Sequence, residues 1–79
     1  MSSQPVHPGV VLNRKLPAEL GPGIGQAAAQ LGISPVALSR VLHAHESITP
    51  ELASTLERAG IGMASTWLSM QAAYDQARS

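Results

Sequence analysis

The stretch that most constrains the fold is 26–43, which reads QAAAQLGISPVALSRVLH. Its first half carries small apolar residues at the spacing of one helical face: Ala27, Ala28 and Leu31. Gly32 predicts the end of that helix, because glycine readily adopts the left-handed conformation found there. A second helix is predicted to begin at Pro35, since the Ser34 hydroxyl can cap its N-terminus and the fixed φ of proline suits a first turn.

The second helix has two unlike faces. Leu38, Val41 and Leu42 share one side and are expected to pack inward. Polar or isolated apolar side chains lie near the opposite side or at its edge: Val36, Ser39, Arg40 and His43. A helix, a tight turn containing glycine and a helix with one apolar face form the pattern of a helix-turn-helix, whose second helix enters the major groove of DNA.

A plain pair of antiparallel helices would show the same spacing. The side chains on the outward face of the second helix therefore have to distinguish a helix-turn-helix from a purely structural helix pair. Ser34, Ser39 and Arg40 can bond phosphates or base edges, and arginine fits the acceptor pair of guanine, which is worth about 1–3 kcal/mol of discrimination. These side chains favour a DNA-reading helix over a purely structural one.

Composition bounds what the rest of the chain can do. The 79 residues form one small domain, and they include no Phe, no Cys, one Trp and one Tyr. Twelve of the apolar residues are Ala, so the core is light and pairing with a second copy would add burial. The formal net charge is zero, which counts against tight DNA binding, since DNA-binding surfaces usually carry a basic excess.

The chain shows no membrane-length apolar run and no signal-peptide pattern, so a cytoplasmic protein without membrane contact is expected. The acidic residues are scattered and no nucleophile has a base beside it, so no catalytic residue and no enzyme activity are predicted. Histidines 7, 43 and 45 have poor spacing for zinc. They are expected to be solvated or to face phosphates, with no metal and no cofactor.

The flanking segments can be placed by their helix signals. Residues 1–6 are predicted to be a flexible tail, and residues 7–79 a single domain. A first helix is expected from Pro8 to Leu16, with Pro17 as its stop and the basic Arg14 and Lys15 in its last turn. The glycine-rich stretch 18–25 is expected to be a loop.

Thr49 and Pro50 predict the start of a further helix, and Gly60 its end. The apolar face of this helix is expected to consist of Leu52, Leu56 and Ala59. Residues 61–64 are then a short link to the last helix.

The last helix brings the two aromatic residues onto one side, together with two neighbours at helical spacing: Trp67, Met70, Gln71 and Tyr74. Two interpretations remain open. The side chains can pack in the core, or they can form a dimer interface, where aromatic residues are enriched.

Several motifs together resemble the HigA-type antitoxins of the Xre-like helix-turn-helix family. The resemblance covers nearly the whole chain. It rests on the opening His7-Pro8-Gly9, on AAQLGISPVALSRVL at 28–42, on Ile48-Thr49-Pro50-Glu51, and on WLSMQAAYD at 67–75.

The resemblance implies an all-α, five-helix, lambda-repressor-like domain that forms a homodimer, and the aromatic face makes the last helix the expected dimerisation helix. It implies binding to double-stranded operator DNA, repression of its own operon, and neutralisation of a RelE-like, HigB-type toxin protein that cleaves mRNA. Combined with the face analysis, it gives the expected DNA-binding set: Gln26, Ser34, Val36, Ser39, Arg40 and His43.

The chain departs from the family pattern at phosphate-binding positions. Gly23-Ile24 replaces the usual Ser-Gln at the start of the second helix, and Val10 replaces an acid. The stretch 43–46, HAHE, replaces Asn-Gly followed by basic residues. Each lost phosphate contact removes about one unit of salt dependence, so weak or strongly salt-sensitive DNA binding is expected.

Two alternatives to an autorepressing antitoxin stay open, and the departures favour the first of them. One is a protein-interaction module of the same fold that binds a toxin and has little affinity for DNA. The other is a free-standing Xre-like transcriptional repressor without a toxin.

Overall fold

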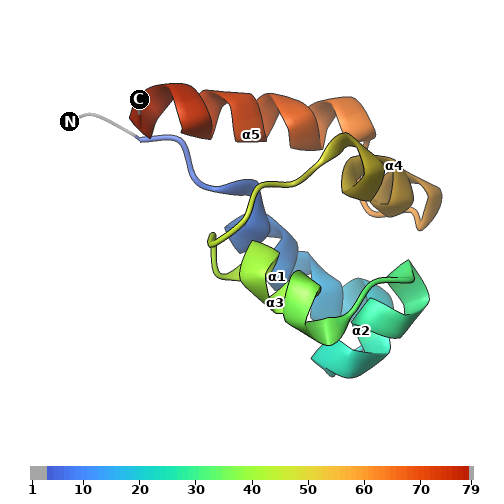
Figure 1. Ribbon diagram of the computed structural model, residues 1–79. Coiled ribbons are helices and arrows are strands. Elements are labelled where there is room, and N and C mark those ends of the chain that lie inside the picture. Colours follow the sequence, from blue (N-terminus) through green and yellow to red (C-terminus); the bar gives the residue numbers. More distant parts are fainter. Residues whose placement is uncertain (1–3, 79) are drawn as a thin grey trace.

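The computed structural model describes residues 4–78, which contain five α-helices and no strands. The helices are α1 (Pro8–Leu20), α2 (Ile24–Leu31), α3 (Pro35–Leu42), α4 (Pro50–Arg58) and α5 (Ala64–Arg78). Figure 1 shows α1, α2 and α3 grouped together, with α4 beside α5 and α5 passing back toward the start of α1. The all-α, five-helix expectation is therefore confirmed.

One apolar cluster joins all five helices. The buried side chains include Leu12 and Leu16 of α1 and Trp67 of α5, together with the apolar faces of the three middle helices. The faces predicted for the second and third helices are buried as expected: Ala27, Ala28, Leu31, Leu38, Val41 and Leu42. Burial of these faces is the main stabilising term in a domain of this size.

In α4 the predicted apolar face is correct for Leu52 and Leu56 and wrong for Ala59. Ala59 is exposed because the helix already ends at Arg58, and Ala53 is buried instead. The helix ends in a Schellman motif, in which the N–H of Ile61 donates to the Leu56 carbonyl at 2.8 Å. Gly60 has the positive φ of 80° that this motif requires, as predicted.

The predicted stop at Pro17 is wrong, because α1 continues through it to Leu20. Pro17 cannot bond the carbonyl one turn earlier, but it and Asn13 are both exposed, so that carbonyl can be hydrated. Leu20 lies one turn beyond the buried Leu16 and packs against the core, which stabilises the extra turn. Arg14 and Lys15 consequently lie in mid-helix and not in the last turn.

The predicted loop at 18–25 shrinks to residues 21–23. Its first part is the last turn of α1, and its last part is the first turn of α2. The side-chain amide of Gln30 donates to the Leu20 carbonyl at 2.9 Å, which ties the end of α1 to α2. A contact of this kind lies beyond what the local pattern of glycines can show.

The ends of the chain are only partly described. Residues 1–3 of the predicted tail, and residue 79, lie outside the described residues, while Gln4, Pro5 and Val6 are exposed and non-helical. Within the described range, none of the helices combines the length and apolarity needed to cross a lipid bilayer.

Candidate nucleic-acid interface

The turn between α2 and α3 has the geometry that the sequence predicts. Gly32 takes the left-handed conformation, with φ of 71°, and the N–H of Ile33 donates to the Ala28 carbonyl at 3.0 Å. The Ser34 hydroxyl accepts a hydrogen bond from the Ala37 N–H at 3.0 Å and caps α3. Both helix ends are thus satisfied locally, and the turn holds α3 at a defined angle to α2.

Helix α3 turns one face into the core and the other toward solvent. Val36 is 63% exposed, and Ser34, Arg40 and His43 are also exposed, while Ser39 is half-buried. The structure therefore places five of the six predicted DNA-binding residues on or beside one outward surface of α3. A surface helix with exposed polar groups and one exposed valine can offer hydrogen bonds to base edges and an apolar contact to a thymine methyl group.

Arg40 is paired with an acid that follows α3. A guanidinium nitrogen of Arg40 lies 3.6 Å from the Glu46 carboxylate, and the two side chains are 61% and 45% exposed. The backbone N–H groups of His45 and Glu46 both donate to the Arg40 carbonyl, at 2.8 and 3.3 Å. Sequence reasoning identified Glu46 as an unusual acid in this loop but missed its pairing with Arg40.

The loop after α3 also contains a residue in a strained conformation. Ala44 has a positive φ of 62°, the left-handed region that glycine adopts at much lower cost. It occupies the position at which the α2 and α4 ends carry Gly32 and Gly60.

His43 is held against its own helix. Its Nδ1 lies 2.9 Å from the Ser39 carbonyl oxygen and 3.3 Å from the Ser39 hydroxyl. A carbonyl oxygen only accepts, so Nδ1 carries the proton and Nε2 of the neutral ring is left as an acceptor.

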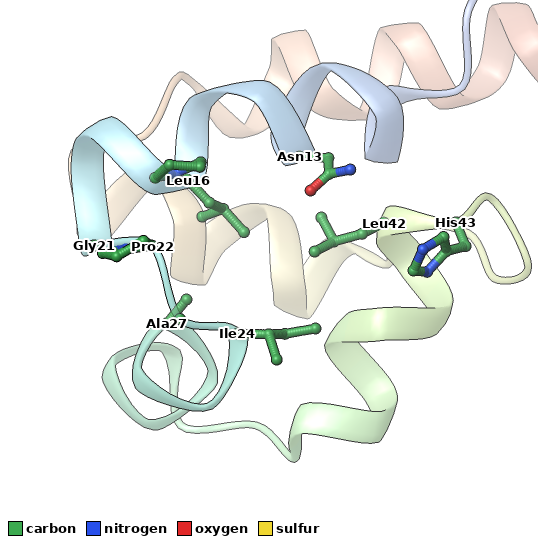
Figure 2. Close-up of a pocket in the computed structure, with 10 residues that line it drawn as sticks. Asn13, Leu16, Gly21, Pro22, Ile24, Ala27, Leu42 and His43 are labelled. Carbon is green, nitrogen blue, oxygen red and sulfur yellow. The ribbon is translucent and has the colours of Figure 1, made fainter.

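A cavity of about 120 Å³ lies between α1, the start of α2 and the end of α3. Figure 2 shows Leu16, Ile24 and Leu42 converging on it from these three helices, with His43 at its edge.

The start of α2 has Gly23 as its N-cap and lacks a side-chain hydrogen bond there, as the departure from the family pattern predicts. The exposed N–H groups of such a helix start can bond a phosphate.

Gln26, the sixth predicted DNA-binding residue, is exposed and belongs to α2, not α3. Its side-chain amide lies over Gly21, close enough that a Cβ on Gly21 would be 2.8 Å from Oε1. The side chain of Gln26 therefore lies against the turn between α1 and α2.

The four predicted dimer residues of α5 divide into two groups. Trp67 is only 1% exposed, and its indole N–H donates to the Ile61 carbonyl at 2.7 Å. Gln71 is buried and accepts a hydrogen bond from the Ile48 N–H at 2.8 Å. Both side chains are therefore used inside the protomer, whereas Met70 and Tyr74 keep exposed surface.

The prediction of solvated histidines is wrong for His7, which is only 4% exposed. Its Nδ1 accepts a hydrogen bond from the Gly9 N–H at 2.9 Å and caps α1. Burial lowers the pKa of His7 below its usual value of 6.5, against the opposing effects of the Asp75 charge and the Glu46 backbone carbonyl.

His43 and His45 are exposed, as expected. Among residues 4–78, no three His, Asp or Glu side chains lie together in a way that could hold a metal ion.

Gly9 explains why the opening His-Pro-Gly sequence matters structurally. A Cβ at this position would overlap the backbone carbonyl of Val41, so only glycine lets the first turn of α1 approach α3 this closely. Sequence reasoning used Gly9 as a family signal without predicting this contact.

Comparisons with solved structures support the fold. An addiction-module antidote protein of the HigA family from Coxiella burnetii superposes with a TM-score of 0.86 at 29% identity, covering 96% of this chain and 83% of the other. A candidate antidote protein of a plasmid maintenance system from Nostoc punctiforme gives 0.83 at 30% identity, with 94% and 80% covered. The antitoxin GraA, with a TM-score of 0.84 at 24% identity, shares the fold.

Comparisons with curated sequences point to virulence-associated proteins of Dichelobacter nodosus. Virulence-associated protein A is 39% identical over 75 residues, which cover 94% of this chain and 74% of the relative. Virulence-associated protein I is 33% identical over 70 residues, which cover 89% of this chain but only 65% of the relative. No protein-family model matches the chain. By these identities the chain belongs to the family that contains virulence-associated protein A and the Nostoc punctiforme antidote protein.

Proposed function

We propose that this protein is the antitoxin of a type II toxin-antitoxin system, and that it binds operator DNA as a homodimer through α3 and neutralises a HigB-type, mRNA-cleaving toxin. The observation that carries the proposal is the exposed face of α3. It presents Ser34, Val36 and Arg40 on a helix whose other face is fixed in the core. Support for the antitoxin role comes from the likeness to antidote proteins of two bacteria.

The DNA part of the proposal assigns separate tasks to the described groups. Arg40 reads a guanine edge, Val36 contacts a thymine methyl group, and Ser34 and Ser39 bond phosphate or base atoms. His43 can accept a hydrogen bond at Nε2. Gln26 and the uncapped start of α2 bond the phosphate backbone at one side of the groove.

The dimer part rests on α5. Met70 and Tyr74 lie one turn apart and retain exposed surface, so they can contact a second copy without unfolding the first. A two-fold dimer would place its two α3 helices about 34 Å apart, one turn of DNA, and would therefore select an inverted repeat.

The experiment that tests the DNA part compares wild type with Arg40→Ala in a footprint of the DNA upstream of the gene. We expect wild type to protect two half-sites related by symmetry. Arg40→Ala should lose the guanine contact, which is about 1–3 kcal/mol of discrimination, with its melting temperature unchanged. The matched control is Arg58→Ala, which removes an equal charge from the exposed end of α4. Equal losses for the two variants would contradict a role for Arg40 in reading DNA.

The toxin part needs its own test. We expect a short, basic reading frame to neighbour the gene. The protein is co-expressed with the product of that frame, and growth is compared with expression of the frame alone. Rescue of growth together with co-purification of the two chains is the expected result. Growth arrest that the protein leaves unrelieved would contradict the antitoxin assignment.

One observation favours the second candidate, a protein-interaction module of the same fold with little DNA affinity. Arg40 is paired with Glu46, and the net charge of the chain is zero. If both footprints are blank while the toxin is still neutralised, this second candidate replaces the first.

A further inference from the structure

We propose that Glu46 is a specificity-determining residue, which competes with DNA for the guanidinium of Arg40. The inference rests on the proposed DNA-binding function of α3. Because of this competition, only a site that offers Arg40 acceptors at least as good as a carboxylate is bound well. Glu46 therefore weakens binding to arbitrary DNA more than binding to the matching operator.

The pairing follows from the way the backbone is held. The N–H groups of His45 and Glu46 both donate to the Arg40 carbonyl, so the backbone holds the acid close to this arginine of the last turn of α3. Two residues farther along, the N–H of the buried Ile48 donates to Gln71 of α5. The loop is thus anchored on both sides of Glu46, and its carboxylate lies 3.6 Å from the guanidinium.

The Arg40–Glu46 pair also determines the net charge of this segment. Between Pro35 and Thr49, Arg40 and Glu46 are the only Asp, Glu, Lys or Arg residues in the sequence. The pair cancels, so the recognition helix and its loop approach the phosphate backbone with no net charge from these side chains. Removing the acid would leave one uncompensated positive charge at the surface that faces DNA.

The chemistry of the exchange discriminates between DNA targets. A carboxylate and the O6/N7 edge of guanine both offer two acceptors to the guanidinium fork, so a guanine placed opposite Arg40 replaces Glu46 with an equivalent partner. A single phosphate contact or an unmatched base edge offers the guanidinium fewer well-placed acceptors than Glu46 does. Glu46 also repels phosphates on either kind of DNA, and this repulsion lowers affinity without regard to sequence.

The test measures the affinity of four proteins for the upstream DNA fragment and for an unrelated fragment, at about 50 and 200 mM salt. They are wild type, Glu46→Gln, Arg40→Ala and the double variant. Glu19→Gln serves as the matched control, because it removes the same charge from an exposed position near the end of α1. Thermal melting of each variant checks that the fold is intact.

We expect Glu46→Gln to bind both fragments about three- to tenfold more tightly than wild type, with the larger gain on the unrelated fragment. Its salt dependence should steepen by about one unit, and Glu19→Gln should change affinity far less. When Arg40 is already replaced by Ala, Glu46→Gln should raise the affinity for DNA only slightly, through the lost repulsion between the carboxylate and the phosphates. That loss of the gain separates competition for Arg40 from simple repulsion.

Three results would overturn the proposal. The first is a Glu46→Gln gain no larger than that of Glu19→Gln, and the second is a gain undiminished in the Arg40→Ala background. Either result leaves the proposed function standing if wild type still prefers the upstream fragment. The third is the lack of any preference in all variants, which overturns both the proposal and the DNA-binding function.

Discussion

The imidazole of His7 meets the ring of Tyr74 edge to face, with centroids 4.8 Å apart and planes at 80°. This contact joins the residue that caps α1 to the C-terminal part of α5. The guanidinium of Arg78 lies over the other partner, 5.4 Å from the centroid of Tyr74. The two ends of the described chain therefore stabilise each other through one buried histidine.

The stability of the protein should fall as the pH drops below about 6.5. Burial lowers the pKa of His7 in the folded protein, so below the unfolded value the unfolded chain binds a proton that the folded chain does not. The stabilising contribution of neutral His7 is therefore complete above the usual pKa. It is lost as the pH falls from 6.5 toward the lower folded pKa, which melting curves between pH 8 and 5 would show.

The control for this prediction is a pair of asparagine variants. His7→Asn keeps a capping oxygen but cannot titrate, and it loses a ring contact worth about 0.5–1.5 kcal/mol. It should lower stability at all pH values and flatten the profile, whereas His45→Asn, at an exposed position, should leave the slope as in wild type. A slope that survives in His7→Asn would assign the pH dependence to another group.

Gly9→Ala should destabilise the protein by at least about 1–3 kcal/mol, because the new methyl group overlaps the Val41 carbonyl and α1 must move away from α3. The matched variant is Gly25→Ala in α2, where a Cβ would meet no atom within 4 Å. That change should instead stabilise by about 0.5–1 kcal/mol. Urea unfolding of both variants measures the difference, and equal effects would contradict the close approach of α1 and α3.

Ala44→Gly should stabilise the protein by about 0.5–1 kcal/mol. Alanine in the left-handed region costs roughly 1–2 kcal/mol, and part of the gain is lost to the greater freedom of glycine in the unfolded chain. The control, Ala29→Gly at an exposed position of α2, should destabilise by up to about 1 kcal/mol. If both changes destabilise, the turn after α3 has a different conformation from the one described.

Trp67→Ala should unfold the protein or lower its stability by about 3–5 kcal/mol, since the ring is buried within the protomer. Loss of the indole hydrogen bond to Ile61 adds to this cost. Thermal melting and mass measurement together distinguish core from interface. A folded monomer with an unchanged melting temperature would move Trp67 from the core to the dimer interface.

Local signals in the sequence predicted the start of α3 and of α4 correctly. Ser34 and Thr49 each cap the helix that their own following proline begins, so neighbouring residues contain all the needed information. The extension of α1 through Pro17 could not be found this way. It depends on Leu20 packing in the core and on its hydrogen bond from Gln30, which lies in the next helix.

In the candidate site, too, some features follow from local sequence signals and others depend on contacts with distant residues. The outward face of α3 follows from helical periodicity, so Val36 and Arg40 were found from sequence alone. The burial of His7 depends on Tyr74, at the far end of the chain, and the pairing of Arg40 depends on how the turn at Ala44 directs Glu46. Neither contact leaves a periodic signal, although an acid shortly after α3 is a hint of the second.

The measurement that tests the central claim most directly is a titration of the purified protein against the DNA upstream of its gene and an unrelated fragment of equal length, at about 50 and 200 mM salt. The account predicts tighter binding to the upstream fragment at both salt concentrations. It also predicts a shallow salt dependence, in place of the strong salt sensitivity that the sequence left open, because the Arg40–Glu46 pair leaves α3 with little charge. Equal, weak binding to the two fragments would contradict operator recognition by α3.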